Sequence, residues 1–309
     1  MLQVGNITIT SIIDGAINGP ARAGFPDKTE EDWIPYRHYL DADGNLPSAI
    51  GAFLVRTGER IMLIDAGGGS HESHTHRSID QPNVELRAKL ARQGLSGEAL
   101  EEAVRQAFIT RMSSGALPHS LWAADIRPED VTDVVLTHLH ADHIGWASDR
   151  GRPYFPNAVV RCAQQDLDFF LGPDVDESFT ILLWGALSAS ERLGPVLDRI
   201  ETWDRDCALA PGIDVRVTPG HTPGSSVVVA SSGTSRALML GDMTHCPVEL
   251  QDYEWQCIGD LDPVMARKAR DAMAREVAAD GALVAGSHFP GLRFGRVLPG
   301  EGVRGWVMP

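Results

Sequence analysis

Three histidines and an aspartate lie within six residues of one another, directly after a short apolar segment at residues 131–137. They are His138, His140, Asp142 and His143. Four such side chains cannot all be core residues, because each would need its own polar partner. In a loop at the end of a strand they can converge, with the first two pointing to one side and the next two toward a second point. This pattern predicts ligands for two metal ions. The alternative is a polar surface loop with histidines placed by chance.

Three further candidate ligands follow downstream, each beside glycine at the end of an expected strand. His221 lies between two Pro-Gly pairs, Asp242 follows an apolar run, and His288 follows another. Taken alone, each has an ordinary structural explanation as a loop or turn residue. Together with the histidine cluster, and in this order, they indicate one shared metal site.

Strand and helix patterns recur in two batches, before and after about residue 200, so we expect an α/β protein. We interpret residues 1–309 as a single domain with two halves and a helical insertion at about 70–112. Strands are expected at 4–10, in a hairpin over 51–65, and at 131–137, 157–161, 213–217, 226–230, 236–240 and 282–285. Helices are expected at 96–112, 163–171, 176–194 and, with Asp262 as N-cap, from Pro263 to about 279.

The charge balance limits the possible partners. Acidic residues outnumber basic ones by 42 to 27, which gives a net charge of −15. This sign disfavours nucleic acid and an anionic membrane surface. No run approaches about 18 apolar residues, and the first ten residues lack a secretory pattern. The four cysteines lie far apart and are expected to be reduced, so we expect a cytoplasmic enzyme with a small-molecule substrate.

These motifs together resemble the metallo-β-lactamase-fold hydrolase superfamily over nearly the whole chain. Within it, the phrases GDMTHCPVEL and GSHFPGLRFG are most similar to the branch that holds N-acyl homoserine lactonases and methyl parathion hydrolase. The long interval between His143 and His221 points the same way. The resemblance implies an αββα sandwich, two mixed β-sheets flanked by helices, with the metal site at one edge between the sheets.

The resemblance also implies a ligand set. It assigns the first metal to His138, His140 and His221, the second to Asp142, His143 and His288, and a bridging role to Asp242. The expected cofactor is therefore two divalent metal ions. Zinc is the first expectation for a site of nitrogen and oxygen donors, with cobalt, manganese and iron as alternatives.

The expected activity is a dinuclear-metal-dependent hydrolysis of small neutral esters or lactones by a metal-bridging hydroxide. Asp142 and Asp242 are the candidates for moving the proton to the leaving group. Trp146 and Phe289 could line an apolar substrate pocket, with core packing as the alternative. A methyl parathion hydrolase-like triesterase is the alternative function. A β-lactamase is less favoured, because that group commonly has cysteine where Asp242 stands.

Other classes fit the residues less well. A ribonuclease of this fold would need a basic face, which the charge of −15 opposes. A persulfide dioxygenase would use one iron, against the seven ligands found. A non-catalytic metal scaffold would not require Asp242 as a bridge.

The insertion at 70–112 is where the chain departs from the family pattern. Its expected helix carries an apolar stripe, for which we expect a homodimer contact that also narrows the pocket, or else packing against its own domain. The stripe consists of Ala99, Val104, Ala107, Phe108 and Met112. His71, His74 and His76 could suggest a third metal, but a solvated loop is the simpler explanation.

Overall fold

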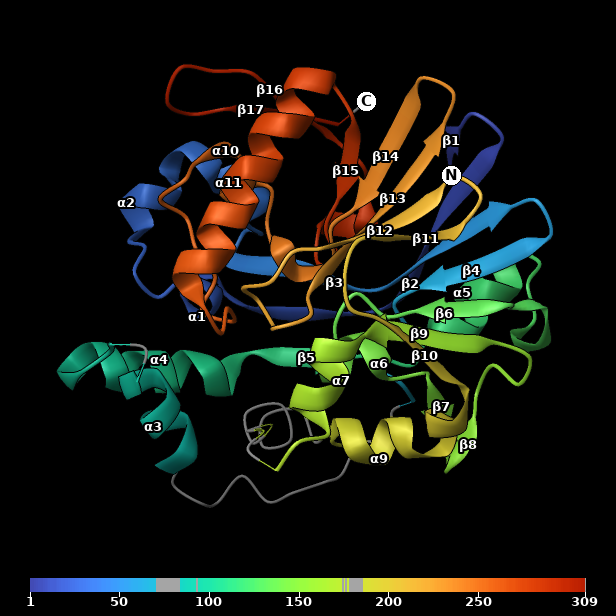
Figure 1. Cartoon of the computed structure of the whole chain (residues 1–309). Helices are drawn as coiled ribbons and strands as arrows, with labels where there is room; N and C mark the ends of the chain where they lie inside the picture. The colour runs from blue at the N-terminus through green and yellow to red at the C-terminus, as the bar shows by residue number, and fades with distance from the viewer. Residues whose placement is uncertain (71–83, 93, 174, 176, 178–185, 309) are drawn as a thin grey trace.

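The computed structural model describes residues 1–70, 84–92, 94–173, 175, 177 and 186–308. Two β-sheets face each other, and helices cover the outer face of each (Figure 1). The expected αββα sandwich is therefore confirmed. Among the described residues, no helix combines the length and the apolar composition that crossing a bilayer requires.

The first sheet has eight strands in the order β1-β2-β3-β4-β6-β9-β10, with β5 paired to β2. The neighbours from β4 to β10 run parallel, and the others run antiparallel. The bounds are β1 (Leu2–Val4), β2 (Ile7–Pro20), β3 (Asn45–Thr57), β4 (Arg60–Ile64), β5 (Arg111–Ser113), β6 (Asp133–Val135), β9 (Val159–Ala163) and β10 (Ile200–Trp203).

The second sheet has five strands in the order β11-β12-β13-β14-β15, and only its last pair, β14 with β15, runs parallel. Two small hairpins, β7 with β8 and β16 with β17, lie outside both sheets. The bounds are β7 (Ser148–Asp149), β8 (Arg152–Pro153), β11 (Cys207–Ala210), β12 (Ile213–Val217), β13 (Ser226–Ser232), β14 (Ser235–Met239), β15 (Leu283–Ala285), β16 (Arg296–Leu298) and β17 (Gly305–Val307).

The longest described helix, α11 (Pro263–Asp280), begins as its sequence predicts. The Asp262 side chain accepts a hydrogen bond from the Met265 amide at 2.9 Å, and Gly281 ends the helix in a left-handed conformation. The other helices are α1 (Ala21–Gly24), α2 (Glu30–Trp33), α3 (Val84–Arg92), α4 (Gly97–Ile109), α5 (Leu117–Ala123), α6 (Ala141–Ile144), α7 (Gln164–Phe170), α9 (Ala189–Leu193) and α10 (Val248–Gln251).

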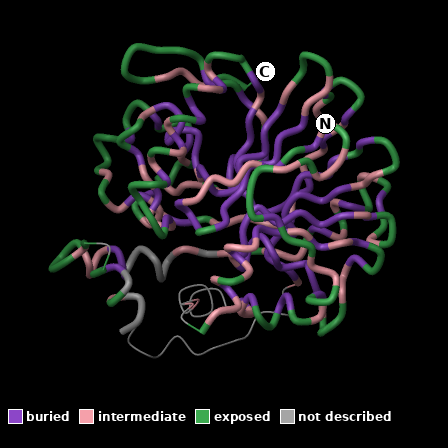
Figure 2. The backbone as a smooth tube through the Cα atoms, in the orientation of Figure 1, coloured by how far each residue is buried: buried purple, intermediate pink, exposed green. Residues whose placement is uncertain are grey.

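Alternating side chains produce separate hydrophobic layers. In β13, Val228 and Ala230 point into the core between the two sheets, while Val227 and Val229 pack against Met273 of α11. A third core lies between the first sheet and α5, α7 and α9. Figure 2 shows the buried chain running through the middle of both sheets. Burial on both faces thus fixes the strands, and the loops at their ends can carry the residues of the site.

The expected helix at 96–112 is wrong at its end, because α4 stops at Ile109 and Met112 lies in β5 opposite Ile17. The close approach of β5 to β2 depends on Gly15, since a Cβ there would lie 1.8 Å from the Ser113 carbonyl oxygen. Tertiary strand pairing thus overrides the helical pattern.

Other expectations are corrected in smaller ways. The expected strand at 4–10 is a hairpin that turns at Gly5, where φ is 58°. Of the expected helix at 176–194, the described part contains only α9, and 178–185 lie outside the described residues. The expectations for His71, His74 and His76 also lie outside them. The pattern missed β10, β11, β16 and β17, which are strands of three or four residues.

Candidate metal centre

The seven predicted ligands lie on loops that leave the ends of strands. Those in the histidine cluster follow β6, and α6 carries its last two members. The other three follow β12, β14 and β15 in the second sheet. The structure brings all seven together in two groups. They are His138, His140, His221 and Asp242 in one group, and Asp142, His143 and His288 in the other.

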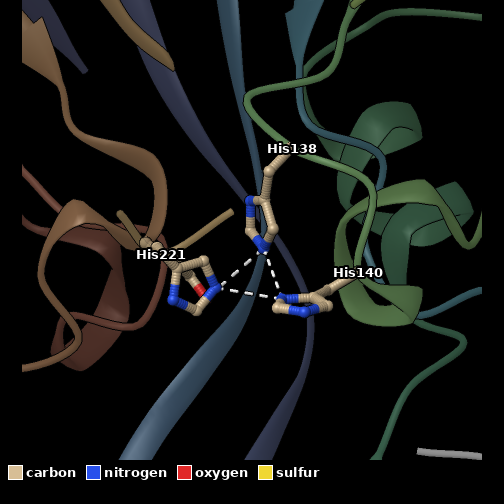
Figure 3. Close-up of side chains that lie close together, drawn as sticks. His138, His140 and His221 are labelled. Atoms are coloured by element: carbon tan, nitrogen blue, oxygen red, sulfur yellow. Dashed lines mark hydrogen bonds and ion pairs between the residues drawn. The ribbon is translucent and has the colours of Figure 1, made fainter. Parts of the chain in front are cut away.

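In the first group, three imidazoles point their nitrogens at one another (Figure 3). His140 Nδ1 lies 2.9 Å from His138 Nε2 and 2.9 Å from His221 Nε2. Asp242 Oδ2 lies 3.7 Å from His138 Nε2 and 3.5 Å from His221 Nε2. Four donor atoms thus surround one point.

The second group shares Asp242 with the first. His288 Nε2 lies 3.4 Å from Asp142 Oδ2, and His143 Nε2 lies 3.8 Å from the same oxygen. Asp242 Oδ1 is 3.3 Å from His143 Nε2, while its Oδ2 is 3.1 Å from His288 Nε2. One carboxylate therefore faces both groups of imidazoles.

In three of the ligand rings, the oxygen beside Nδ1 determines which ring nitrogen carries the proton and which one is left to face the centre. Nδ1 of His143, His221 and His288 each lies against an oxygen that can only accept, so Nδ1 carries the proton. Nε2 of each ring then points to the centre and presents a lone pair there when the ring is neutral. Burial would lower the pKa of His143 and of His288, but Asp242 outweighs it and raises both, so a cation would have to displace a proton from these two rings. The accepting oxygens are, in that order, Asp65 Oδ2 at 3.0 Å, Asp260 Oδ1 at 3.2 Å and the Ala49 carbonyl at 2.8 Å.

These residues fit two divalent cations. His140 Nδ1 lies 2.9 Å from two other ring nitrogens and can donate a hydrogen bond to only one of them, so a cation between the three rings would satisfy the remaining lone pairs. Two buried atoms of the centre, His143 Nε2 and Asp242 Oδ1, also have no hydrogen-bond partner within the described part of the chain. Imidazole and carboxylate without sulfur suit zinc, and equally cobalt, manganese or iron.

Burial and charge decide the protonation of the ligands. Burial lowers the pKa of His138 and of His221, which favours their neutral, ligating form. Burial alone would raise the pKa of Asp242, but His143 and His288 outweigh it and hold that pKa well below its usual range. Asp242 is therefore ionised.

Asp65 supports the second group, a role that the sequence pattern did not reveal. Besides His143, it accepts hydrogen bonds from the Thr137 amide at 2.8 Å and the Ser287 hydroxyl at 2.9 Å. Its φ of 64° lies in the left-handed region, where aspartate is one of the few tolerated side chains. An aspartate between a strand and three glycines was the only available signal.

Asp166, at the start of α7, ties that helix to the turn that bears His221. It accepts from the Thr222 hydroxyl at 2.8 Å and from the Gly224 amide at 2.6 Å. Burial raises the pKa of Asp166 to about 6. This carboxyl therefore keeps its proton to a higher pH than an ordinary aspartate.

His245 is a sixth imidazole at the centre, outside the predicted set of seven residues. Its Nε2 lies 3.4 Å from Asp242 Oδ2, and its ring stacks on His288 with 5.6 Å between centroids. Its side chain is 13% exposed. It lies in the phrase GDMTHCPVEL, which indicates the family branch but does not by itself predict a ligand.

The two residues predicted to line a substrate pocket, Trp146 and Phe289, are buried. Trp146 is 4% exposed in the core beneath the first sheet, and its Nε1 donates to Asp14 at 3.0 Å. Phe289 is 1% exposed and stacks edge-on against Trp306. Core packing, the alternative explanation, describes both side chains in this structure, and their contact with a substrate stays a prediction.

Comparisons with known proteins agree with this architecture. The model of the Metallo-beta-lactamase superfamily matches residues 47–288. Metallo-beta-lactamase domain-containing protein 1 of Mus musculus is 31% identical over 58% of this chain, and the chain spans 59% of its length. The Homo sapiens protein of that name is 28% identical over 80% of this chain and 77% of its own length.

Solved structures share the fold at lower identity. The hydrolase AbOPH of the beta lactamase superfamily has a TM-score of 0.76 at 24% identity, covering 100% of this chain and 96% of its own. AidC, a dizinc quorum-quenching lactonase, has a TM-score of 0.78 at 21% identity, with the same coverage. With its family model spanning most of the chain and its seven donors gathered in two groups, this protein belongs to the metallo-beta-lactamase superfamily.

Proposed function

We propose that this protein is a hydrolase of small neutral esters or lactones that works with two divalent metal ions, zinc first among them. The observation that carries the proposal is the convergence of seven nitrogen and oxygen donors in two groups that face one carboxylate, Asp242. Two fold neighbours support the substrate class. AidC is described in complex with a homoserine product, and AiiA with N-decanoyl-L-homoserine at its active site.

Two divalent cations at such a centre would supply a water of lowered pKa and polarise the bond to be cleaved. The chain's own residues must then hold the cations and move a proton. His138 and His221 are neutral donors for this purpose, and Asp242 is ionised. Asp142 faces the two imidazoles of the second group, with Oδ2 3.4 Å from His288 Nε2 and 3.8 Å from His143 Nε2. We assign proton transfer from the attacking water to the leaving oxygen to Asp142 and Asp242.

A hydrolysis panel tests this proposal. The purified protein would be loaded separately with zinc, cobalt and manganese and assayed on acyl homoserine lactones, aryl esters, paraoxon-type triesters and nitrocefin. We expect the highest kcat/KM on a lactone or ester. Activity should disappear with a chelator and return when metal is added back.

The matched control is Asp242→Ala, because it removes the carboxylate shared by both groups. A preference for the triester or for nitrocefin would contradict the proposed substrate class but not the proposed metal centre. No hydrolysis of any of the four by protein with two bound metals would overturn the proposal.

A further inference from the structure

Arg270 is the largest fully buried side chain among the described residues, and it lies beside the metal centre on α11. Its guanidinium makes three contacts in three directions. Nη2 donates to Asp260 Oδ2 at 2.7 Å, Nε donates to the Met243 carbonyl at 2.8 Å, and Nη1 lies 3.1 Å from Glu249 Oε1. A buried arginine is unfavourable unless it is paired, so this position requires an explanation.

The first contact leads to a metal ligand. Asp260 holds Nδ1 of His221 with its other oxygen, at 3.2 Å, and is itself fully buried. A carboxylate behind a ligand imidazole fixes the ring's orientation and raises its basicity. Arg270 in turn fixes the carboxylate, because its planar fork permits little rotation once two nitrogens are engaged.

The second and third contacts lead to the loop that carries Asp242. Met243, whose carbonyl accepts from Arg270, directly follows that ligand. Glu249 Oε2 accepts from the amides of His245 at 2.6 Å and Cys246 at 3.1 Å, so it closes the same loop. Arg270 therefore contacts the supports of two different ligand loops.

The same helix abuts the His221 turn directly. The Asp262 amide donates to the Gly220 carbonyl at 2.8 Å, and the Leu261 amide donates to the His221 carbonyl at 3.1 Å. A Cβ at Gly220 would lie 2.4 Å from the Ala266 nitrogen, so that turn and α11 pack without spare room. The position of α11, which carries Arg270, relative to the His221 turn is thus set by backbone contacts.

We propose that Arg270 is a positioning residue that locks His221, through Asp260, and the Asp242 loop, through Glu249 and Met243, into one metal-binding geometry. This inference rests on the proposed function, because it assumes that the first group binds a metal ion. A merely structural ion pair would affect folding stability and leave the affinity for each metal unchanged. The two roles therefore differ in a measurable quantity.

The test is stepwise metal binding measured by chelator competition, with Co²⁺ absorption spectra as a second readout. We expect Arg270→Met to weaken one of the two metal affinities roughly ten- to hundred-fold and to change the Co²⁺ spectrum. Arg270→Lys, which keeps the charge but loses the fork, should fall between wild type and Arg270→Met. In an Asp260→Asn background the Arg270→Met substitution should cost less affinity, because the route to His221 is already broken.

Asp133→Asn is the matched control. Asp133 is a fully buried carboxylate paired with Arg60 and Arg161 at the start of β6, at the end of that strand away from the ligands. The Asp133→Asn substitution should lower the free energy of unfolding without weakening one metal affinity more than the other. Arg270→Lys and Asp260→Asn keep the test available if Arg270→Met does not fold.

Two outcomes would overturn the inference. Unchanged affinities and spectra in the folded Arg270 variants would reduce Arg270 to a structural residue, while wild type still binds two metals. A wild-type protein that binds no metal would instead overturn the proposed function, and this inference with it.

Discussion

Asp242 Oδ1 lies 3.3 Å from His143 Nε2, and within the described residues neither atom has a hydrogen-bond partner. Both side chains are almost fully buried. Buried polar atoms without hydrogen bonds are costly, so these two must be stabilised either as an ion pair or by a cation held between the two groups. The other oxygen of Asp242 faces His221 and His288, at 3.5 Å and 3.1 Å. One carboxylate therefore couples the two groups.

Asp242→Ala should reduce the metal content from near two per chain and almost abolish hydrolysis. Asp242→Asn keeps the shape but removes the charge, and it should retain more metal than the alanine variant. Elemental analysis after gel filtration checks both. A stoichiometry fixed at one in wild-type protein under metal-replete conditions would falsify the dinuclear site.

Asp65→Ala should destabilise the metal-free protein by about 1–3 kcal/mol, because the buried donors of Thr137 and Ser287 lose their acceptor. It should also weaken the second group, since His143 loses the carboxylate that orients it. Asp65→Asn is the control, because asparagine tolerates the left-handed backbone and keeps one acceptor. Chemical denaturation and metal titration measure the two effects. Equal losses of stability and of metal affinity in the Asp65→Ala and Asp65→Asn variants would contradict the proposal that the shape and the acceptor oxygens of Asp65 support this group.

Stability should depend on pH through Asp166, whose pKa burial raises to about 6. The folded protein holds this proton between about pH 4 and 6, where the unfolded chain releases it. The stability that the protonated form contributes is present below pH 4 and is lost as the pH rises through 6. The free energy of unfolding of wild type, relative to Asp166→Asn, should fall by roughly 2–3 kcal/mol over this range.

Urea denaturation of both metal-free proteins, from pH 4 to 7.5 in the presence of a chelator, checks this dependence. All other titrating groups are common to the two proteins and cancel in the difference. A difference that stays constant with pH would show that Asp166 has an ordinary pKa.

Trp146→Ala should cost about 3–5 kcal/mol of unfolding free energy, because it empties a core position and leaves Asp14 without one donor. Trp146→Phe should cost less. Under conditions where both variants are folded, their substrate preference should match that of wild type. A changed preference in a stable Trp146→Ala protein would return this residue to the pocket.

The insertion remains a candidate for a dimer contact. In the structure Leu90 of α3 and Val104 of α4 are buried together against Ile258, close to the loop that holds Asp260. Replacing 71–110 with a short Gly-Ser bridge should leave a folded, metal-loaded protein with an altered substrate range, an altered mass in solution, or both. Light scattering and the hydrolysis panel measure these, and a variant unchanged in both would reject the role.

The sequence alone predicted the seven residues that the structure brings together in two groups, because each lies in a short motif at the end of a strand. His138 and Asp142 belong to a motif of six residues, so their closeness follows from local geometry and does not depend on the rest of the chain. The start of α11 was predictable for the same reason, since Asp262 caps an amide three residues away. Alternating apolar residues likewise predicted most of the longer strands.

Tertiary structure determined which residues support these donors. It also determined the secondary structure at positions where local propensity predicted the wrong element. Ser287 lies 222 positions from Asp65 in sequence, and Trp146 lies 132 positions from Asp14, yet each pair is hydrogen-bonded. Met112 lies in a strand and not in the expected helix, because it pairs with β2, a strand from the distant N-terminal region. Local sequence specifies which groups a loop presents. The partners that orient those groups depend on which strands and helices are packed together, and that is a property of the whole folded chain.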